Sequence, residues 1–253
     1  MVAEGKQTFR TKYFGDKAFY KMIMAIALPI VIQNLLTNFV AMLDNVMVGK
    51  IGTDQMTGVA IINQLFFVFN LAVFGGMSGA GIFSAQYFGQ NNHNGARNVF
   101  RMKLIIGIFI IAISMCVLII LHEPLINMFL HEGGASGNIH ATFKYARDYL
   151  YVMLFSIIPF VVANCYSTTL KEAGQTMVPM IAGLLAVIVD FVFNALLIFG
   201  LLGFPKLGVI GAAIATVMSR FVECGYLIIY TYRHSDKYRF IKGVYSNLHV
   251  PSS

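Results

Sequence analysis

The chain has 253 residues, of which 58% are apolar and only 11% are charged, and its formal net charge is +7. A soluble globular domain contains about 25% charged residues, so this chain has too little charge to cover a surface that faces water. The composition therefore excludes an ordinary soluble domain and predicts a protein whose main solvent is lipid.

Six apolar segments are long enough to cross a bilayer, which takes about 20 mostly apolar residues in a helix. Helices are expected because open sheets and irregular chain leave backbone groups unsatisfied in hydrocarbon. The sequence thus predicts an all-α, polytopic membrane protein, with a cytoplasmic segment at 1–21, a six-helix transmembrane lobe at 22–232 and a cytoplasmic tail at 233–253. The expected spans are residues 22–48, 56–76, 99–121, 149–170, 177–200 and 208–232.

Basic residues are distributed unevenly between the two ends of these spans. Most of the lysines and arginines lie before span one and after spans two, four and six, whereas the alternate links contain only Lys50, Lys144, Arg147 and Lys206. Such residues mark the cytoplasmic side of membrane proteins, so both termini are expected in the cytoplasm and the chain in the cell (inner or plasma) membrane. Because these charges are spread over separate links, no nucleic-acid partner is expected.

The first span carries polar side chains on a wide face. Gln33, Thr37 and Asp44 are separated by four and seven residues, which places them on one side of a helix. An unpaired carboxylate is costly in hydrocarbon, so this side is expected to face protein or water. A second polar stripe runs beside it and consists of Asn34, Asn38 and Asn45.

The link between spans three and four contains "HEGGASGNIHATFKYARD" and is the longest external link. Its second half is rich in aromatic residues, which settle at membrane interfaces. We therefore expect this half to lie along the membrane surface.

Spans five and six carry the remaining charges that lie away from the span ends, whereas Arg101 and Lys103 lie near the start of span three. Asp190 and Asn194 are one helical turn apart, and Thr216, Arg220 and Glu223 share one face of span six. Arg220 and Glu223 are three residues apart, a spacing at which opposite charges interact on a helix. The cysteines lie within spans at no spacing typical of a metal site, so no transition-metal centre is expected.

Four side chains with oxygen ligands are expected at similar depths in the outer half of the membrane. From the rise of a helix, Asp44 and Asn194 lie ~8–9 Å from the outer ends of their spans. The same rise places Thr216 at ~12 Å and Asp190 at ~15 Å. Two carboxylates, an amide and a hydroxyl suit Na⁺ or a proton and lack the soft ligands that zinc and copper prefer. The alternative is that these groups form hydrogen bonds that hold the helices together.

Four stretches share an order and a spacing with a known family. They are "LPIVIQNLLTNFVAMLDNVMVG" in span one, "GAGIFSAQYFGQNN" at the end of span two, "LKEAGQTMVPM" between spans four and five, and "GFPKLGVIGAAIATVMSR" at the start of span six. Together they resemble the multidrug and toxic compound extrusion (MATE) family over about residues 15–235.

The resemblance implies the first lobe of a twelve-helix antiporter that expels small, mostly cationic and amphipathic drugs or dyes against Na⁺ or H⁺. Asp44 and Thr216 match an aspartate and a threonine of the cation site that some prokaryotic members have in this lobe. The helix-five pair of those members runs Asn-x-x-x-Asp, whereas here Asp190 precedes Asn194. The resemblance assigns cation or proton binding to these four residues, with no cofactor besides the coupling ion. Candidate residues for the lining of a substrate cavity are Gln33, Thr37, Asn38, Asn164 and Arg220.

Two other functions stay open at this point. A lipid-linked oligosaccharide flippase of the same superfamily would favour several basic residues for pyrophosphate, and Arg220 alone is available away from the ends of the predicted spans. The chain is also consistent with a truncated lobe that does not transport; a transporting lobe would need a second six-helix lobe or a dimer partner. The spans contain no nucleophile–histidine–carboxylate set, so an enzyme is not expected.

Overall fold

The structure is a computed structural model that describes residues 16–132, 138–241 and residue 244. Within these ranges it contains helices and no strand, which confirms the predicted all-α class. Six of the helices are long and apolar enough to cross a membrane. The elements are α2 (Lys17–Gly49), α3 (Thr53–Gly89), α4 (His93–Ile120), α5 (His122–Glu132), α6 (Ile139–Glu172), α7 (Met177–Phe199) and α8 (Val209–Arg233), with short 3-10 turns η1 (Leu201–Gly203) and η2 (Arg239–Ile241).

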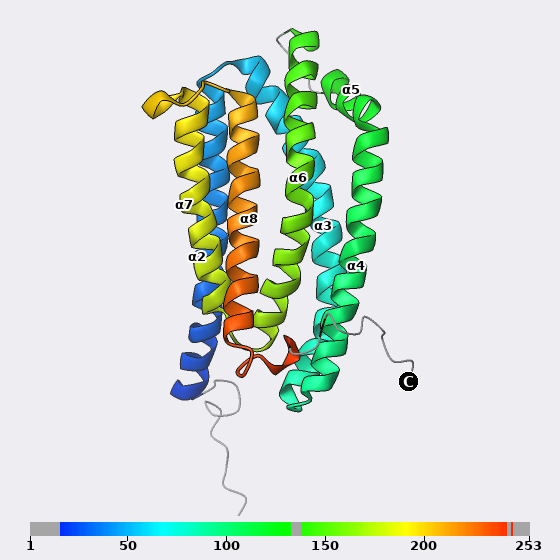
Figure 1. The fold of residues 1–253 in the computed structure, drawn as a ribbon, viewed down its shortest axis with the longest axis vertical. Coiled ribbons are helices and arrows are strands. Elements are labelled where there is room, and N and C mark those ends of the chain that lie inside the picture. The colour runs from blue at the N-terminus through cyan, green and yellow to red at the C-terminus, as the bar shows by residue number, and fades with distance from the viewer. Residues whose placement is uncertain (1–15, 133–137, 242–243, 245–253) are drawn as a thin grey trace, which may run out of the picture.

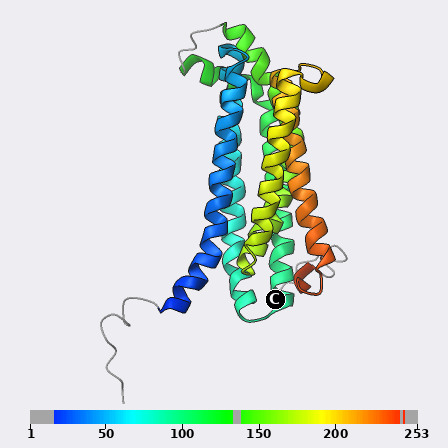
Figure 2. The ribbon, with the colours of Figure 1, turned by 90° about the vertical axis from the view of Figure 1, so that its left-hand side faces the viewer.

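The six long helices stand side by side in one bundle (Figure 1). Successive long helices run in opposite directions, so the start of α2 and the end of α8 lie at the same end of the bundle (Figures 1 and 2). Helix α6 packs against both α3 and α8, while α7 packs against α2 and α8. Of the six candidate spans, α6 is the most buried and α2 the least.

Two glycines allow neighbouring helices to approach closely. A Cβ atom at Gly211 of α8 would lie 2.7 Å from the backbone oxygen of Leu197 on α7. A Cβ atom at Gly58 of α3 would lie 2.9 Å from the backbone nitrogen of Ala146 on α6. Small residues at such crossings are typical of helix packing in membranes, where close van der Waals contact drives association.

Helix α6 begins earlier than the sequence predicts. The segment expected along the membrane surface forms the first turns of α6, so that expectation is wrong for residues from Ile139 onward. Asn138 caps this helix by accepting hydrogen bonds from the backbone nitrogens of His140 and Ala141. Thr142 and Ala146 in these turns are buried, so packing within the protein determines where this segment lies.

Other elements also differ from the prediction, since α2 begins at Lys17 rather than near residue 22 and α4 at His93 rather than near residue 99. Helix α3 continues to Gly89 rather than ending near residue 76, and its added turns bury Met77, Ala80 and Ser84. The link between α4 and α6 contains the short helix α5, which the sequence did not predict. Hydropathy underestimated α3 because its last turns are rich in glycine, serine and alanine, which pack well although they are weakly apolar.

The segment after α8 packs back on the end of the bundle. Tyr238, Phe240, Ile241 and Val244 are buried. Arg97 of α4 donates a hydrogen bond to the backbone oxygen of Arg239 at 3.2 Å. The first part of the predicted tail at 233–253 is thus a packed element, while residues 245–253, like residues 1–15 of the predicted N-terminal segment, lie outside the described ranges.

Candidate cation site and adjoining cavities

Three residues from two helices meet at the centre of the candidate site. The side-chain nitrogen of Asn194 on α7 donates hydrogen bonds to Asp44 Oδ1 on α2 at 2.6 Å and to Asp190 Oδ2 at 3.1 Å. Asp190 and Asn194 are buried, and Asp44 is half-buried. Three of the four residues that the sequence placed at similar depths therefore lie in contact.

The amide oxygen of Asn194 is an acceptor with no partner in the described structure. It is buried and receives no hydrogen bond from the described residues. A buried acceptor without a partner is costly, and here it lies on the same amide group that bridges two carboxylates. Carboxylate and amide oxygens are hard ligands of the kind that alkali and alkaline-earth cations accept. The donor set therefore fits a small hard cation.

Helix α8 supplies two hydroxyl groups beside the carboxylates. Ser219 donates a hydrogen bond to Asp190 Oδ1 at 3.4 Å. Thr216 donates its hydroxyl hydrogen to the backbone oxygen of Ala212 at 3.1 Å, and it lines both of the cavities described below. The sequence analysis missed Ser219, although it lies three residues after Thr216 and so shares its face of the helix.

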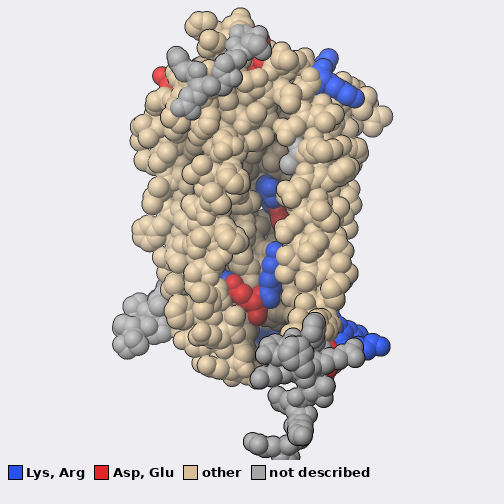
Figure 3. Space-filling view, turned by 180° about the vertical axis from the view of Figure 1, so that it is seen from behind, with Lys and Arg blue, Asp and Glu red and all other residues tan. Residues whose placement is uncertain are grey.

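Two cavities adjoin the carboxylates and share three lining residues, Asp44, Thr216 and Arg220. The larger has a volume of about 310 Å³ and the smaller of about 110 Å³. Figure 3 shows one face of the bundle hollowed along its length, with acidic and basic side chains inside and uncharged walls on both sides. The smaller cavity contains Asp190, Ser219 and Glu223 in its lining.

The lining of the larger cavity combines amide groups with aromatic rings. Helix α3 contributes Asn63, Asn70, Phe66 and Phe69, and α6 contributes residues that include Tyr149, Ser156 and Phe160. The sequence analysis overlooked Asn63 and Asn70, although their separation of seven residues places both on one helical face. Their role depends on which way that face of α3 points, and a single span does not reveal this.

Arg220 forms the ion pair that its spacing predicts. Its Nη1 lies 3.0 Å from Glu223 Oε2. Its Cζ also lies 5.1 Å from the centre of the Phe160 ring, a distance at which the ring face attracts a cation.

The other candidate lining residues have mixed positions. Thr37 lines the smaller cavity. Gln33 donates a hydrogen bond to the backbone oxygen of Pro179 at 3.3 Å and so joins α2 to α7. Asn38 is exposed on α2, and Asn164 donates to the backbone oxygen of Phe160 on its own helix at 2.9 Å. Gln33, Asn38 and Asn164 belong to the lining of neither cavity.

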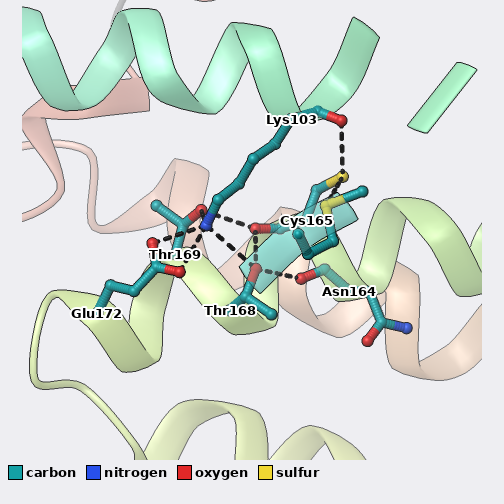
Figure 4. A network of polar contacts seen from close by, with 7 residues as sticks. Lys103, Asn164, Cys165, Thr168, Thr169 and Glu172 are labelled. Atoms are coloured by element: carbon teal, nitrogen blue, oxygen red, sulfur yellow. Dashed lines mark hydrogen bonds and ion pairs between the residues drawn. The ribbon is translucent and has the colours of Figure 1, made fainter. Parts of the chain in front are cut away.

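A buried ion pair lies outside both cavities, and the sequence analysis did not predict it (Figure 4). Lys103 of α4 is fully buried, and its Nζ lies 2.6 Å and 2.7 Å from the two carboxylate oxygens of Glu172 on α6. The hydroxyl oxygens of Thr168 and Thr169 accept further hydrogen bonds from Nζ at 3.3 Å and 3.2 Å. Lys103 lies near the start of the predicted span at 99–121, and its bonds to Glu172 make it an internal contact between two helices.

Comparison with known proteins places the chain in one family. Residues 29–196 match the family model MatE. The chain is 30% identical over 224 residues to the Probable multidrug resistance protein NorM of Thermotoga maritima, covering 88% of this chain and 47% of that protein. It is 26% identical over 238 residues to the Probable multidrug resistance protein YoeA of Bacillus subtilis, covering 92% of this chain and 49% of that protein. The chain therefore spans about half the length of the curated relatives that it matches.

Solved structures share the fold at low sequence identity. One described as the outward-facing conformation of a multidrug resistance MATE family transporter superposes with a TM-score of 0.73 at 23% identity, over 86% of this chain and 46% of that chain. A MOP superfamily transporter from Pyrococcus furiosus gives a TM-score of 0.70 at 23% identity, over 86% and 46% of the two chains. The six-helix bundle corresponds to one lobe, which is about half of a family member. Because the family model matches most of its length, this chain belongs to the MatE family.

Proposed function

We propose that the chain is the N-terminal lobe of a drug/cation antiporter that exports small, cationic, amphipathic compounds in exchange for Na⁺ or H⁺. In this proposal Asp44, Asp190, Asn194 and Thr216 bind the coupling ion. The observation that carries it is the Asp44–Asn194–Asp190 cluster, in which two carboxylates and an unpartnered amide oxygen adjoin a cavity.

The larger cavity supports the part of the proposal that concerns the exported compound. Its Phe66, Phe69 and Phe160 rings offer apolar surface and ring faces that attract organic cations. Asn63 and Asn70 add hydrogen-bonding groups without charge. An amphipathic cation needs this combination, because its apolar body must be buried while its charge stays near Asp44.

Exchange follows from the position of Asp44 at the boundary between the two cavities. A coupling ion and an organic cation both require the negative charge of the carboxylates, so binding of one opposes binding of the other. A conformational change that alternates access to the two sides of the membrane then converts this competition into antiport.

Arg220 is the observation that favours a second candidate, export of a lipid-linked pyrophosphate. A guanidinium group binds phosphate oxygens well. Arg220 is, however, already paired with Glu223 at 3.0 Å and has Asp44 among its neighbours in the cavity lining. These carboxylates would repel a pyrophosphate, so the antiporter is the better supported function.

The test uses a two-lobed protein that contains this lobe, reconstituted in vesicles with an imposed Na⁺ or H⁺ gradient. Asp44→Asn should reduce gradient-driven efflux of a cationic dye to the level of empty vesicles, while the amount of protein in the membrane stays unchanged. Asp54→Asn is the matched control, because Asp54 lies in the first turn of α3 and lines neither cavity. Wild-type efflux by Asp44→Asn would refute the proposed site.

A further inference from the structure

Arg220 occupies the junction of the two cavities. It lines both of them, together with Asp44 and Thr216. Among the residues that the structure describes, it is the only lysine or arginine in the lining of either cavity, whereas Asp44, Asp190 and Glu223 supply carboxylates. In the linings of these cavities Arg220 is therefore placed among three acidic side chains, directly beside the candidate cation site.

The contacts of Arg220 leave room for a different partner. One of its nitrogens, Nη1, donates to Glu223 Oε2 at 3.0 Å, and its Cζ lies 5.1 Å from the centre of the Phe160 ring. A guanidinium group carries five N–H donors. Its side chain is 30% exposed and the smaller cavity, which Asp190 also lines, is next to it. The side chain thus has both the donors and the adjacent space to contact a second acceptor.

The carboxylate pair needs a positive charge whenever its cation leaves. Asp190 is buried and Asp44 is half-buried, so their ionised forms have lost much of their hydration. Two such charges without a counter-ion repel each other and are costly to bury. A long side chain that is always charged and is anchored one turn from Thr216 can supply the missing charge.

We propose that Arg220 is a tethered cation that replaces the coupling ion between transport steps. This inference rests on the cation-binding function proposed above. The guanidinium turns from Glu223 toward Asp44 and Asp190 when the site is empty, and it returns to Glu223 when a cation binds. Arg220 is then the specificity-determining residue that sets how tightly the site holds a cation, and Glu223 is the positioning residue that holds Arg220 aside.

The two members of the ion pair are expected to change cation affinity in opposite directions. Arg220→Gln removes the competing internal cation, so the Kd for Na⁺ or for tetraphenylphosphonium should fall by about tenfold. Glu223→Gln releases Arg220 to pair with the carboxylates, so the same Kd should rise by about tenfold. If the Arg220–Glu223 pair only stabilised α8, both single variants would shift the Kd in the same direction, because either substitution breaks the same contact.

The double variant separates a tethered cation from the simple electric field of two charges. If Glu223 acts by holding Arg220, then Glu223→Gln should have little effect once Arg220 is absent. The Kd of the double variant should therefore match that of Arg220→Gln. If both charges act only through space, their effects add, and the double variant should bind like the wild-type chain.

The experiment measures binding of Na⁺ and of tetraphenylphosphonium to the purified 253-residue chain in detergent by titration calorimetry. Arg220→Lys retains the charge and should bind with an affinity within about threefold of the wild-type value. This variant also provides a second measurement if Arg220→Gln fails to fold. Arg147→Gln is the matched control, because Arg147 pairs with Asp148 and lines neither cavity.

The outcomes distinguish this inference from the function on which it rests. The tethered cation is supported if the wild-type chain binds the cations, the two single variants shift the Kd in opposite directions, and the double variant has the Kd of Arg220→Gln. The tethered cation is overturned, and the proposed cation site is not, if the wild-type chain binds the cations but the effects on the Kd are additive or both single variants shift the Kd in the same direction. Binding of neither cation by the wild-type chain overturns the proposed cation site together with this inference.

Discussion

Asn194 on α7 donates a 2.6 Å hydrogen bond to Asp44 on α2, a residue 150 positions earlier in the chain. The same amide nitrogen contacts Asp190, one turn away on its own helix, at 3.1 Å. Asn194 therefore joins the two carboxylates, and we propose that this contact lets the exchanged helix-five pair preserve a cation site.

Restoring the usual order of the family tests that explanation. In a two-lobed protein, Asp190→Asn alone should abolish most gradient-driven dye efflux, because one carboxylate cannot replace the charge of two. The double exchange Asp190→Asn with Asn194→Asp moves the carboxylate about 6 Å along α7, to the position that already contacts Asp44. We expect it to keep partial efflux, measured in vesicles and normalised to protein level.

Two results would contradict this account of the pair. Wild-type efflux by Asp190→Asn would mean that Asp190 only holds helices together, since asparagine still forms hydrogen bonds. Complete loss in the double exchange, with normal amounts of folded protein, would mean that the depth of the carboxylate is fixed by something other than its contact with Asp44.

The Lys103–Glu172 pair is predicted to stabilise the lobe. Lys103→Met leaves the Glu172 carboxylate without its partner in a largely buried position, where loss of one member of a pair costs about 3–5 kcal/mol. Lys103→Met combined with Glu172→Gln removes both charges and should recover most of that stability. Equilibrium unfolding in detergent micelles measures the difference, with Lys144→Met at an exposed position of α6 as the control. Equal losses in the single and double variants would show that packing of the Lys103 stem matters more than charge.

The distribution of basic residues predicts that the end of the bundle with both described chain ends faces the cytoplasm. A cysteine at Leu202, whose side chain is 89% exposed in the turn between α7 and α8, should react with an impermeant thiol reagent in intact cells. A cysteine at the exposed Gln90, between α3 and α4, should react only after permeabilisation. Both belong in a Cys116→Ala background, because Cys116 is the exposed free cysteine.

Two positions are less suitable for this labelling. Ser136, in the link between α5 and α6, is also expected outside, but it lies outside the described residues. Asn92 caps α4 by accepting from the backbone nitrogen of Gly95, so Gln90 is the safer position on that side. The reverse labelling pattern would invert the predicted orientation.

Expression of the 253-residue chain alone is predicted to give no drug resistance unless it forms a dimer. Asn34, Thr37 and Asn38 are exposed on α2, and exposed polar groups at membrane depth require water or a second protein surface. The relatives have about twice the length, which leaves room for a second lobe. Minimum inhibitory concentrations, measured together with cross-linking, give the result, and resistance from a demonstrably monomeric chain would contradict the prediction.

The sequence by itself determined the class of the protein, the six spans and the Arg220–Glu223 pair. Each depends on a property that is local along the chain: the run of apolar residues sets a span, and a spacing of three residues brings two charges together on one helix. The same local reasoning identified Asp44, Asp190, Asn194 and Thr216 as candidate ligands, since polar groups within a span are costly unless they are satisfied.

Only the tertiary structure decided which of these groups meet. The contact between Asn194 and Asp44 depends on how α2 and α7 are rotated about their axes, as does the inclusion of Asn63 and Tyr149 in the cavity lining. Lys103 and Glu172 appear unremarkable when each is considered within its own segment, because only packing of α4 on α6 buries them together. Hydropathy records the cost of placing a residue in lipid, whereas rotation and packing of helices determine whether that residue faces lipid at all.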